Sequence, residues 1–299
     1  MIEITGLRKT FGVGHKAVNA LNGVDLKIDS GMFGLLGPNG AGKTTFMRIL
    51  AGIVRPTSGT VLVNENDLAT EAGKQAVKSM LGYLPQELGM YTDLSARQFV
   101  DYMAILKGMD DSQNRSQRVD EVLETVGLQD VSHLKIKGFS GGMKRRVGIA
   151  QALVNDPKML IVDEPTAGLD PEERIRFRNL LVNLAKDRVV ILSTHIVEDI
   201  GQTCRDLAVL AKGCILFRGS PTELLHATEG HVWTLTLPGL EKPDHELTVV
   251  SMLHLAEGTQ YRLVGSSAGE YLDAVPVQPG LEESYVWLMK QAERTEVSM

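Results

Sequence analysis

The chain has 299 residues, of which 43% are hydrophobic and 23% charged, an ordinary composition for a globular protein with a substantial core. Its net charge of −6 argues against a protein built as a whole to bind polyanions, and its two cysteines exclude a disulfide framework or a four-cysteine zinc site. The start lacks the pattern of a signal peptide, and no stretch reaches the roughly 18 apolar residues of a membrane span. We therefore expect a soluble, reduced, cytoplasmic protein.

Charge is distributed unevenly along the chain. Residues 229–299 carry eleven acidic and four basic side chains, a net charge of −7, whereas residues 1–228 carry a net charge of +1. Such a shift marks a candidate domain boundary, and it falls close to the turn-prone tripeptide Gly219-Ser220-Pro221. We expect a larger domain over residues 1–220 and a small acidic accessory domain over residues 221–299.

Short apolar strands alternate with helices in the larger domain. The strand pattern covers residues 1–4, 24–28, 33–36, 60–63, 159–162, 189–192, 207–210 and 214–217. The helical pattern covers residues 43–51, 95–107, 112–126, 144–153 and 172–184. This alternation predicts an α/β domain with a mainly parallel sheet. Strands over 232–237, 247–253 and 261–264 and a helix over 281–290 predict a small α+β appendage.

A glycine-rich segment lies between the strand at 33–36 and the helix at 43–51. Gly37-Pro38-Asn39-Gly40-Ala41-Gly42-Lys43-Thr44, here called the cradle, fits the pattern G-x-x-x-x-G-K-[ST]. Its glycines allow a tight loop whose N–H groups turn inward on a phosphate chain, at the positive end of the following helix. We expect Lys43 to lie against the β- and γ-phosphates and Thr44 to bind Mg²⁺. The alternative is a glycine-rich turn with an incidental lysine.

Two acidic residues end the apolar strand at 159–162. Asp163 and Glu164 follow Lys43 by about 120 residues, and the carboxyl ends of parallel strands are where such sheets bind ligands. Asp163 is placed to hold Mg²⁺ through water, and Glu164 to orient or deprotonate an attacking water molecule. The alternative is a strand end capped by two solvated acids.

Together with these two segments, further motifs resemble those of the ATP-binding-cassette (ABC) ATPases. Ser140-Gly141-Gly142, here called the signature loop, resembles the family's Leu-Ser-Gly-Gly-Gln, with Phe139 replacing the leucine and Met143 the glutamine. The match covers about residues 1–220, with motifs in the family's order and spacing. The other matching positions are Gln86 in the glutamine loop, Asp170 in the turn after the acid pair, His195 as the switch histidine and Phe11 where an aromatic ring stacks on adenine.

The resemblance implies a P-loop NTPase fold with a helical subdomain over about residues 87–155, and it implies ATP and Mg²⁺ as cofactors. The implied nucleotide-binding residues are Phe11, Gly37, Pro38, Asn39, Gly40, Ala41, Gly42, Lys43, Thr44, Thr45, Ser140, Gly141, Gly142 and Asp170. The implied metal-binding residues are Thr44, Gln86 and Asp163. The implied catalytic residues are Glu164, His195 and Gln86.

The signature loop opens a predicted helix, so that its hydroxyl and amides form a second anion site. One chain does not need two such sites for one nucleotide. The resemblance implies the reason, because two cassettes pair head to tail and each signature loop closes on the partner's γ-phosphate. Gln86 would then sense that phosphate through Mg²⁺ and water, and His195 would hydrogen-bond it and steady Glu164.

Some of the candidate functional residues also fit a purely structural role. Taken alone, Phe11 is more often a packing residue than an adenine platform, and His195 more often a helix-entry residue than a catalytic group. Lys144-Arg145-Arg146 would fit a nucleic-acid patch, but three bases on one helix are usually a solvated face.

The amino-acid sequence around the signature loop resembles that of ABC subunits of bacterial drug exporters, whose membrane partner is a separate chain. The apolar residues Leu88, Met90, Tyr91 and Leu94 form either a groove for a cytoplasmic helix of that permease or the core of the subdomain. We expect an ATPase subunit that powers an exporter from the inner face of the cell membrane, with no nucleic-acid partner. The alternative is a soluble ABC ATPase acting on ribosomes or nucleic acid, which the single uninterrupted cassette disfavours.

Overall fold

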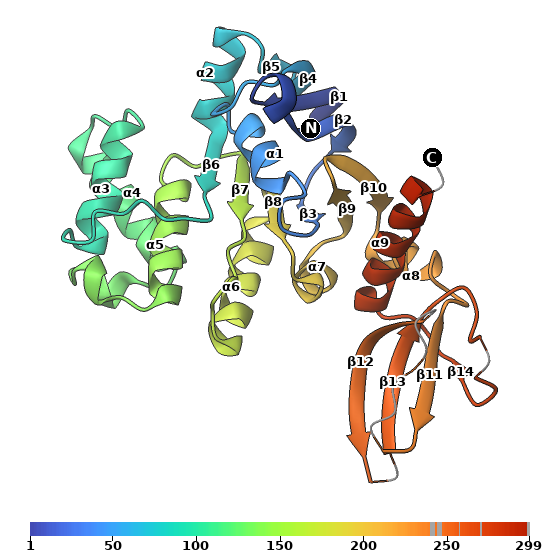
Figure 1. Cartoon of the computed structure of the whole chain (residues 1–299). Coiled ribbons are helices and arrows are strands. Elements are labelled where there is room, and N and C mark those ends of the chain that lie inside the picture. Colours follow the sequence, from blue (N-terminus) through green and yellow to red (C-terminus); the bar gives the residue numbers. More distant parts are fainter. Residues whose placement is uncertain (240–242, 244–246, 257, 270, 298–299) are drawn as a thin grey trace. The chain divides into compact units, whose positions relative to one another are not determined.

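The computed structural model describes residues 1–239, 243, 247–256, 258–269 and 271–297 (Figure 1). The chain forms two compact units, and each is described here by itself. The first consists of Met1–His195 with Leu210–Ile215, and the second of Ile196–Val209 with Leu216–Met299. The domain boundary at residue 220 stays a prediction of the sequence.

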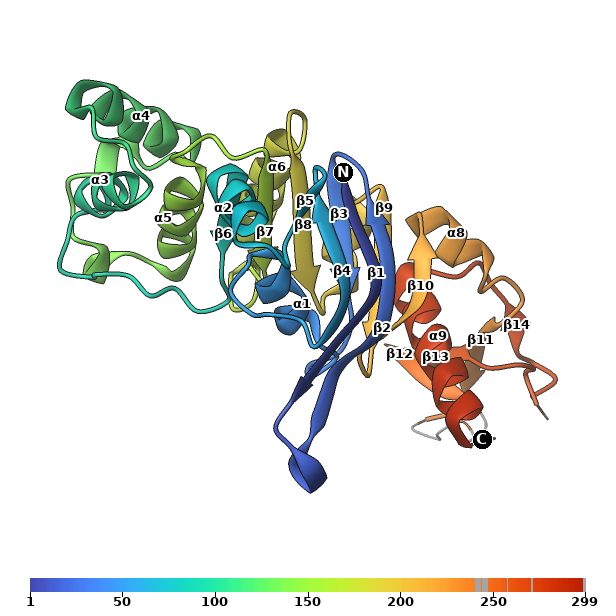
Figure 2. The same cartoon turned by 90° about the horizontal axis from the view of Figure 1, so that it is seen from above.

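An antiparallel sheet opens the first unit. Its strands are β1 (Ile2–Phe11), β2 (Val18–Ile28), β4 (Ser58–Val63) and β5 (Asn66–Asp67), in the order β2-β1-β4-β5. Ile2, Ile4 and Leu7 of β1 are buried, while exposed residues alternate with them only in part, because the register with β2 shifts three times. Figure 2 shows β1 and β2 extending as a hairpin, with one turn of 3₁₀ helix, η1 (Gly14–Lys16), at its tip.

The second sheet is mainly parallel and carries the predicted motifs. β3 (Met32–Leu36), β8 (Val189–Thr194), β7 (Met159–Asp163) and β6 (Leu81–Leu84) are successive neighbours. Every residue of β3 and β7 is buried, as expected for parallel strands that are covered on both faces. The full sheet has the order β10-β9-β3-β8-β7-β6, and residues 210–215 are the part of β9 (Asp206–Ala211) and β10 (Cys214–Gly219) that belongs to this unit. The strand β8 therefore lies between β3 and β7, which brings the carboxyl ends of all three together.

Helices of the first unit fall into two sets. α1 (Lys43–Leu50) and α2 (Glu71–Met80) contact strands of the two sheets, and α6 (Pro171–Leu184) follows β7 along the chain. α3 (Ala96–Leu106), α4 (Ser112–Thr125) and α5 (Gly141–Leu153) pack against one another, with η2 (Gln129–Val131) and η3 (Ile136–Gly138) in the connections, and form a separate green group in Figure 1. Side-chain oxygens of Ser95, Asp111 and Ser140 cap the three helices of this group at their N-termini.

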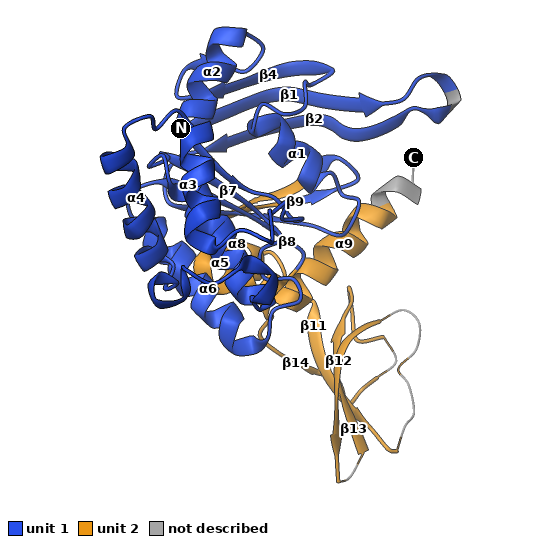
Figure 3. Cartoon of the chain, turned by 90° about the vertical axis from the view of Figure 1, so that its left-hand side faces the viewer, with its two compact units in different colours: residues 1–195, 210–215 blue, residues 196–209, 216–299 orange. Residues whose placement is uncertain are grey.

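The described residues of the second unit form an antiparallel sheet in the order β12-β13-β11-β14, drawn in orange in Figure 3, and three helices. Trp287 of the last helix packs with Val232 and Val264 of the sheet, and a further cluster forms around Tyr261 and Leu263. The elements are α7 (Val197–Thr203), α8 (Pro221–His226), β11 (Val232–Leu237), β12 (Thr248–Leu255), β13 (Gly258–Val264), β14 (Val275–Pro276) and α9 (Leu281–Val297).

The predicted α/β fold class is confirmed, and most predicted elements are present with shifted ends. The first two strands are longer than predicted, and α2, β6, α7 and α8 have no counterpart among the predictions. Within the described ranges, no helix is both long and apolar enough to cross a membrane.

Candidate nucleotide site

The cradle connects the buried strand β3 to the first turn of α1. Gly42 is the N-cap of α1 with φ 110°, a left-handed backbone that favours glycine. A Cβ atom on Gly42 would collide with the carbonyl oxygen of Ala20, and one on Gly37 with that of Leu210. The glycine spacing is therefore required both by the turn and by the close approach of neighbouring backbone, as the pattern predicts.

Lys43 is buried and turns back over the cradle. Its Nζ donates to the carbonyl oxygens of Gly37 at 2.7 Å and Pro38 at 3.2 Å. The same Nζ lies 3.1 Å from Glu164 Oε1, and the two side chains are only 4% and 7% exposed. A buried ammonium group needs such partners, because an unpaired charge is costly in the interior. The acid that follows β7 supplies the counter-charge of the cradle lysine.

Glu164 also binds the predicted switch histidine. His195 Nδ1 lies 2.7 Å from Glu164 Oε2, and the backbone N–H of Glu164 donates to Ser193 O at 2.9 Å. Glu164 has φ 48°, a left-handed conformation that is uncommon outside glycine and that recurs at functional sites. His195 follows β8, which lies between β3 and β7, so that the sheet order brings Lys43, Glu164 and His195 into one chain of contacts.

Asp163, the last residue of β7, is fully buried. Neither of its carboxylate oxygens has a hydrogen-bond partner among the described residues, and the same holds for the hydroxyl of neighbouring Ser193. Burial raises the pKa of the Asp163 carboxyl above its usual value, while the nearby hydroxyls of Ser193 and Thr44 act in the opposite direction. A buried carboxylate beside a threonine hydroxyl is a donor set of the hard oxygen atoms that Mg²⁺ prefers, so these residues fit that ion.

The signature loop begins α5. Ser140 Oγ accepts a hydrogen bond from the backbone N–H of Met143 at 3.2 Å and so caps the helix. A Cβ atom on Gly142 would collide with the side chain of Glu173 on α6. In the described part of the chain, no hydrogen bond joins the signature loop to the cradle.

Three other predicted residues lie at loops or element ends. Gln86 is exposed, and its carbonyl oxygen accepts from Arg145 Nη1 at 2.7 Å. Asp170 caps α6 through a hydrogen bond of 2.9 Å from the N–H of Glu173. Phe11 is 44% exposed at the end of β1, with Lys9 Nζ 4.8 Å from its ring centroid. The contacts of Gln86, Asp170 and Phe11 with nucleotide or metal therefore stay predictions.

Three residues near the site were missed or misassigned from sequence. Arg145 and Arg146 are half-buried rather than part of a solvated face, because Arg145 holds the glutamine loop and Arg146 Nη2 lies 3.4 Å from Glu173 Oε1. Ser193, buried beside Asp163, could have been found only from the position of its strand in the sheet, which no local pattern reveals.

Known proteins share this architecture. The ABC transporter family matches residues 21–167. The chain is 39% identical over 204 residues to YxlF of Bacillus subtilis, described as an uncharacterized ABC transporter ATP-binding protein, with 68% of this chain and 66% of that relative covered. It is 34% identical over 232 residues to Nod factor export ATP-binding protein I of Cupriavidus metallidurans, with 77% of this chain and 74% of that relative covered. A dimeric post-hydrolysis state of the cassette MJ0796 bound to ADP and Pi superposes with a TM-score of 0.67 at 25% identity, covering 74% of this chain and 98% of that one.

Fold, site and relatives agree on the class of protein, which is that of the nucleotide-binding ABC ATPases. The chain belongs to the family of ABC transporter ATP-binding proteins. The predicted family and enzyme class are thereby confirmed. The chain covers slightly less than two thirds of YxlF, so the activity and partners of the whole transporter are treated below as proposals.

Proposed function

We propose that this chain hydrolyses ATP at the site of Lys43, Asp163, Glu164 and His195 and uses the energy to drive an exporter whose membrane permease is a separate chain. The observation that carries the proposal is the contact of Glu164 with both Lys43 and His195. It supports a shared role, since a carboxylate next to a phosphate-binding lysine can act on water at the γ-phosphate.

The residues act in a definite order in this proposal. The phosphates of ATP take over the donors of Lys43, which releases Glu164 Oε1 from its ion pair. Glu164, still held by His195, then accepts a proton from the attacking water, whose oxygen bonds to the γ-phosphorus as ADP leaves. His195 keeps the carboxylate in position through Nδ1.

Mg²⁺ is proposed as the metal of this site. When bound, it would neutralise phosphate charge. Asp163 would hold it through its unpartnered carboxylate, the Thr44 hydroxyl would contribute a second oxygen, and the side chain of Gln86 would reach it from the exposed loop.

Dimerisation is the proposed source of mechanical work. Ser140, Gly141 and Gly142 would bind the γ-phosphate held by a second copy, so that ATP favours a closed pair and its hydrolysis releases the pair. The dimeric state of MJ0796 supports this arrangement, and the export role in the name of Nod factor export ATP-binding protein I supports an exporter.

A cavity beside the glutamine loop is the proposed docking place of the permease. Its volume is about 580 Å³, and its lining comprises Met90, Tyr91, Thr92, Asp93, Leu94 and Tyr102. Tyr91 is 59% exposed and stacks edge-on against Tyr102 with ring centroids 5.6 Å apart. Exposure of this aromatic pair favours the groove over the subdomain core, and it would hold the chain on the cytoplasmic face of the membrane.

Affinity purification from native membranes tests this function. The chain should carry a membrane protein with it, and Tyr91→Asp should lose that protein, whereas Ile53→Asp, an equal change at an exposed residue of the first unit, should keep it. Fractionation with ribosomes or nucleic acid instead would overturn the transporter proposal and favour the soluble alternative.

A further inference from the structure

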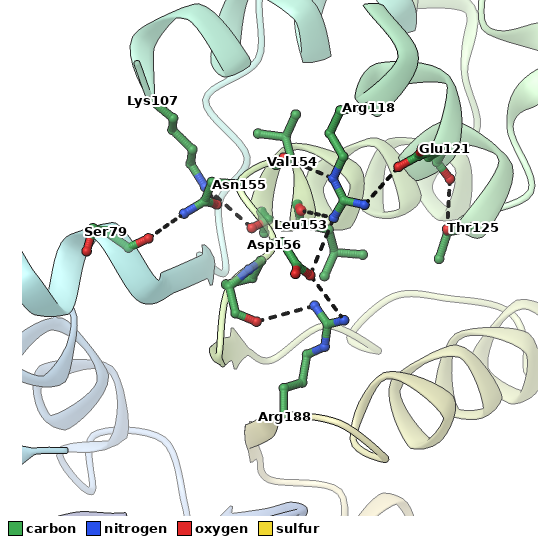
Figure 4. A network of polar contacts seen from close by, with 12 residues as sticks. Ser79, Lys107, Arg118, Glu121, Thr125, Leu153, Val154, Asn155, Asp156 and Arg188 are labelled. Carbon is green, nitrogen blue, oxygen red and sulfur yellow. Dashed lines mark hydrogen bonds and ion pairs between the residues drawn. The ribbon is translucent and has the colours of Figure 1, made fainter. Parts of the chain in front are cut away.

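The loop of residues 154–158 is the only connection along the chain between α5 and β7. The signature loop stands at the start of α5, and Asp163 and Glu164 stand at the far end of β7. The angle between this helix and this strand therefore fixes where the signature loop lies relative to the acid pair. Figure 4 shows the polar contacts that surround the loop.

Two cations cover the C-terminal end of α5. Arg118 of α4 donates to the carbonyl oxygens of Leu153 at 2.9 Å and Val154 at 3.1 Å. Lys107, which follows α3, donates to Asn155 Oδ1 at 2.7 Å and to Ala152 O at 3.4 Å. The last carbonyl groups of a helix lack partners within the helix and attract positive charge, so these contacts join α5 to the rest of the helical group.

The other side of the loop is tied to the end of α2 and to the residue before β8. Asn155 Nδ2 donates to Ser79 O at 2.9 Å, and the backbone N–H of Lys158 donates to Met80 O at 2.9 Å. Arg188, which directly precedes β8, donates to Pro157 O at 3.4 Å. The loop is thus held by the helical group at its start and by α2 and Arg188 at its end.

Asp156 joins the two sides. Its Oδ1 lies 3.6 Å from Nη2 of Arg118 and 3.6 Å from Nη2 of Arg188. Its φ of 48° is left-handed, and its N–H donates to Leu153 O at 3.0 Å. The Asp156 side chain is 62% exposed, and exposed ion pairs contribute only about 0–1 kcal/mol to stability. A contribution to stability is therefore too small to explain why the Asp156 carboxylate bridges two guanidinium groups from different parts of the unit.

We propose that Arg118, Asp156 and Arg188, here called the loop clamp, set the tilt of α5 relative to β7. α5 also contacts β6, where Gln151 Nε2 donates to Tyr83 O at 3.2 Å, so the helix is supported along its length and the clamp holds its C-terminal end. In the dimer of the proposed function, on which this part rests, the signature loop serves the partner's nucleotide while Glu164 serves the chain's own. The three clamp residues are positioning residues that couple the two sites.

Pulsed electron paramagnetic resonance tests the tilt without any need for catalysis. Spin labels at Glu124→Cys in the helical group and Glu65→Cys beside the sheets, both exposed, are placed in a Cys214→Ser background and diluted with unlabelled chain. Asp156→Asn keeps the side-chain shape and tolerates a left-handed backbone, and Arg188→Gln removes the second partner. Asp187→Asn, an exposed acid next to Arg188, is the matched control.

The distance distribution should broaden with Asp156→Asn and with Arg188→Gln, should broaden no further in the double variant, and should match the wild type with Asp187→Asn. ATP turnover should fall about threefold or more in the clamp variants while ATP affinity stays unchanged. Unchanged distributions would overturn the clamp, as would a parallel fall in ATP affinity. A wild-type chain without turnover would overturn the proposed function alone, because the distance distributions decide the clamp independently.

Discussion

Lys43 and Glu164 form a buried ion pair, with Nζ 3.1 Å from Oε1. Glu164, which is proposed to activate water, is thus paired through Oε1 with Lys43, which is proposed to bind phosphate. His195 contacts the other carboxylate oxygen of Glu164, Oε2. In the proposed mechanism, binding of ATP breaks the contact of Glu164 with Lys43 and leaves its contact with His195. The ion pair therefore links nucleotide binding to the release of the base.

Removal of the lysine should weaken nucleotide binding itself. Lys43→Ala loses charge-assisted contacts to the phosphates, and we expect ATP affinity to fall about tenfold or more, since such contacts contribute about 1.5–3 kcal/mol. Titration calorimetry with MgATP measures this. Lys27→Ala, at an exposed lysine paired with Glu3, is the control and should bind as the wild type does. Equal affinity in Lys43→Ala would remove the cradle from the site.

His195 should matter for turnover more than for binding. His195→Ala frees the Glu164 carboxylate to rotate, and we expect kcat to drop about tenfold or more, the worth of one hydrogen bond to a charged group. His226→Ala provides a matched control, because His226 makes a similar 2.8 Å contact with Glu229. Steady-state phosphate release compares the two. A His195→Ala chain with wild-type kcat would exclude the positioning role.

The buried Asp163 carboxylate should lower the stability of the protein when neither metal nor nucleotide is bound. Its carboxylate is buried without hydrogen-bond partners among the described residues, and its pKa is raised by that burial, so the charged form destabilises the fold. Asp163→Asn should therefore raise the melting temperature of the nucleotide-free, metal-free protein. The gain in melting temperature on adding MgATP should be large for the wild type and small for the variant. A lower melting temperature for the free variant would contradict a metal-binding role for the unpaired carboxylate.

The lowered pKa of Lys107 should make the stability of the protein depend on pH. Burial lowers the pKa of its ammonium group from 10.5 to about 8. Between these values the folded chain binds fewer protons at this site than the unfolded chain, so its contribution to the free energy of unfolding rises with pH across the window. Urea unfolding of the wild type and of Lys107→Met, at about pH 7 and about pH 10, should show the wild type gaining relative to the variant at the higher pH. An identical difference at both pH values would mean that the lysine is not desolvated.

Sequence patterns predicted the cradle because its glycines are required locally, by the turn at Gly42 and the close approach at Gly37. They predicted β7 and β8 as buried strands because both are short continuous apolar runs. The contact of Lys43 with Glu164 could not be predicted from the sequence, since it depends on β8 lying between β3 and β7. The helix α2 was missed because it has few large apolar side chains, and only Gly73, Lys74 and Val77 are buried.

The most direct test of the account is phosphate release by Glu164→Gln, measured beside the wild type at saturating MgATP. The amide keeps the shape of the side chain but cannot take a proton, and general bases contribute about 10²–10⁴ to rate. The account predicts a loss of at least about 100-fold with ATP affinity retained or increased, because Lys43 is released from its ion pair. Glu172→Gln, an exposed glutamate on α6, should release phosphate as the wild type does. Wild-type phosphate release by Glu164→Gln would contradict the account.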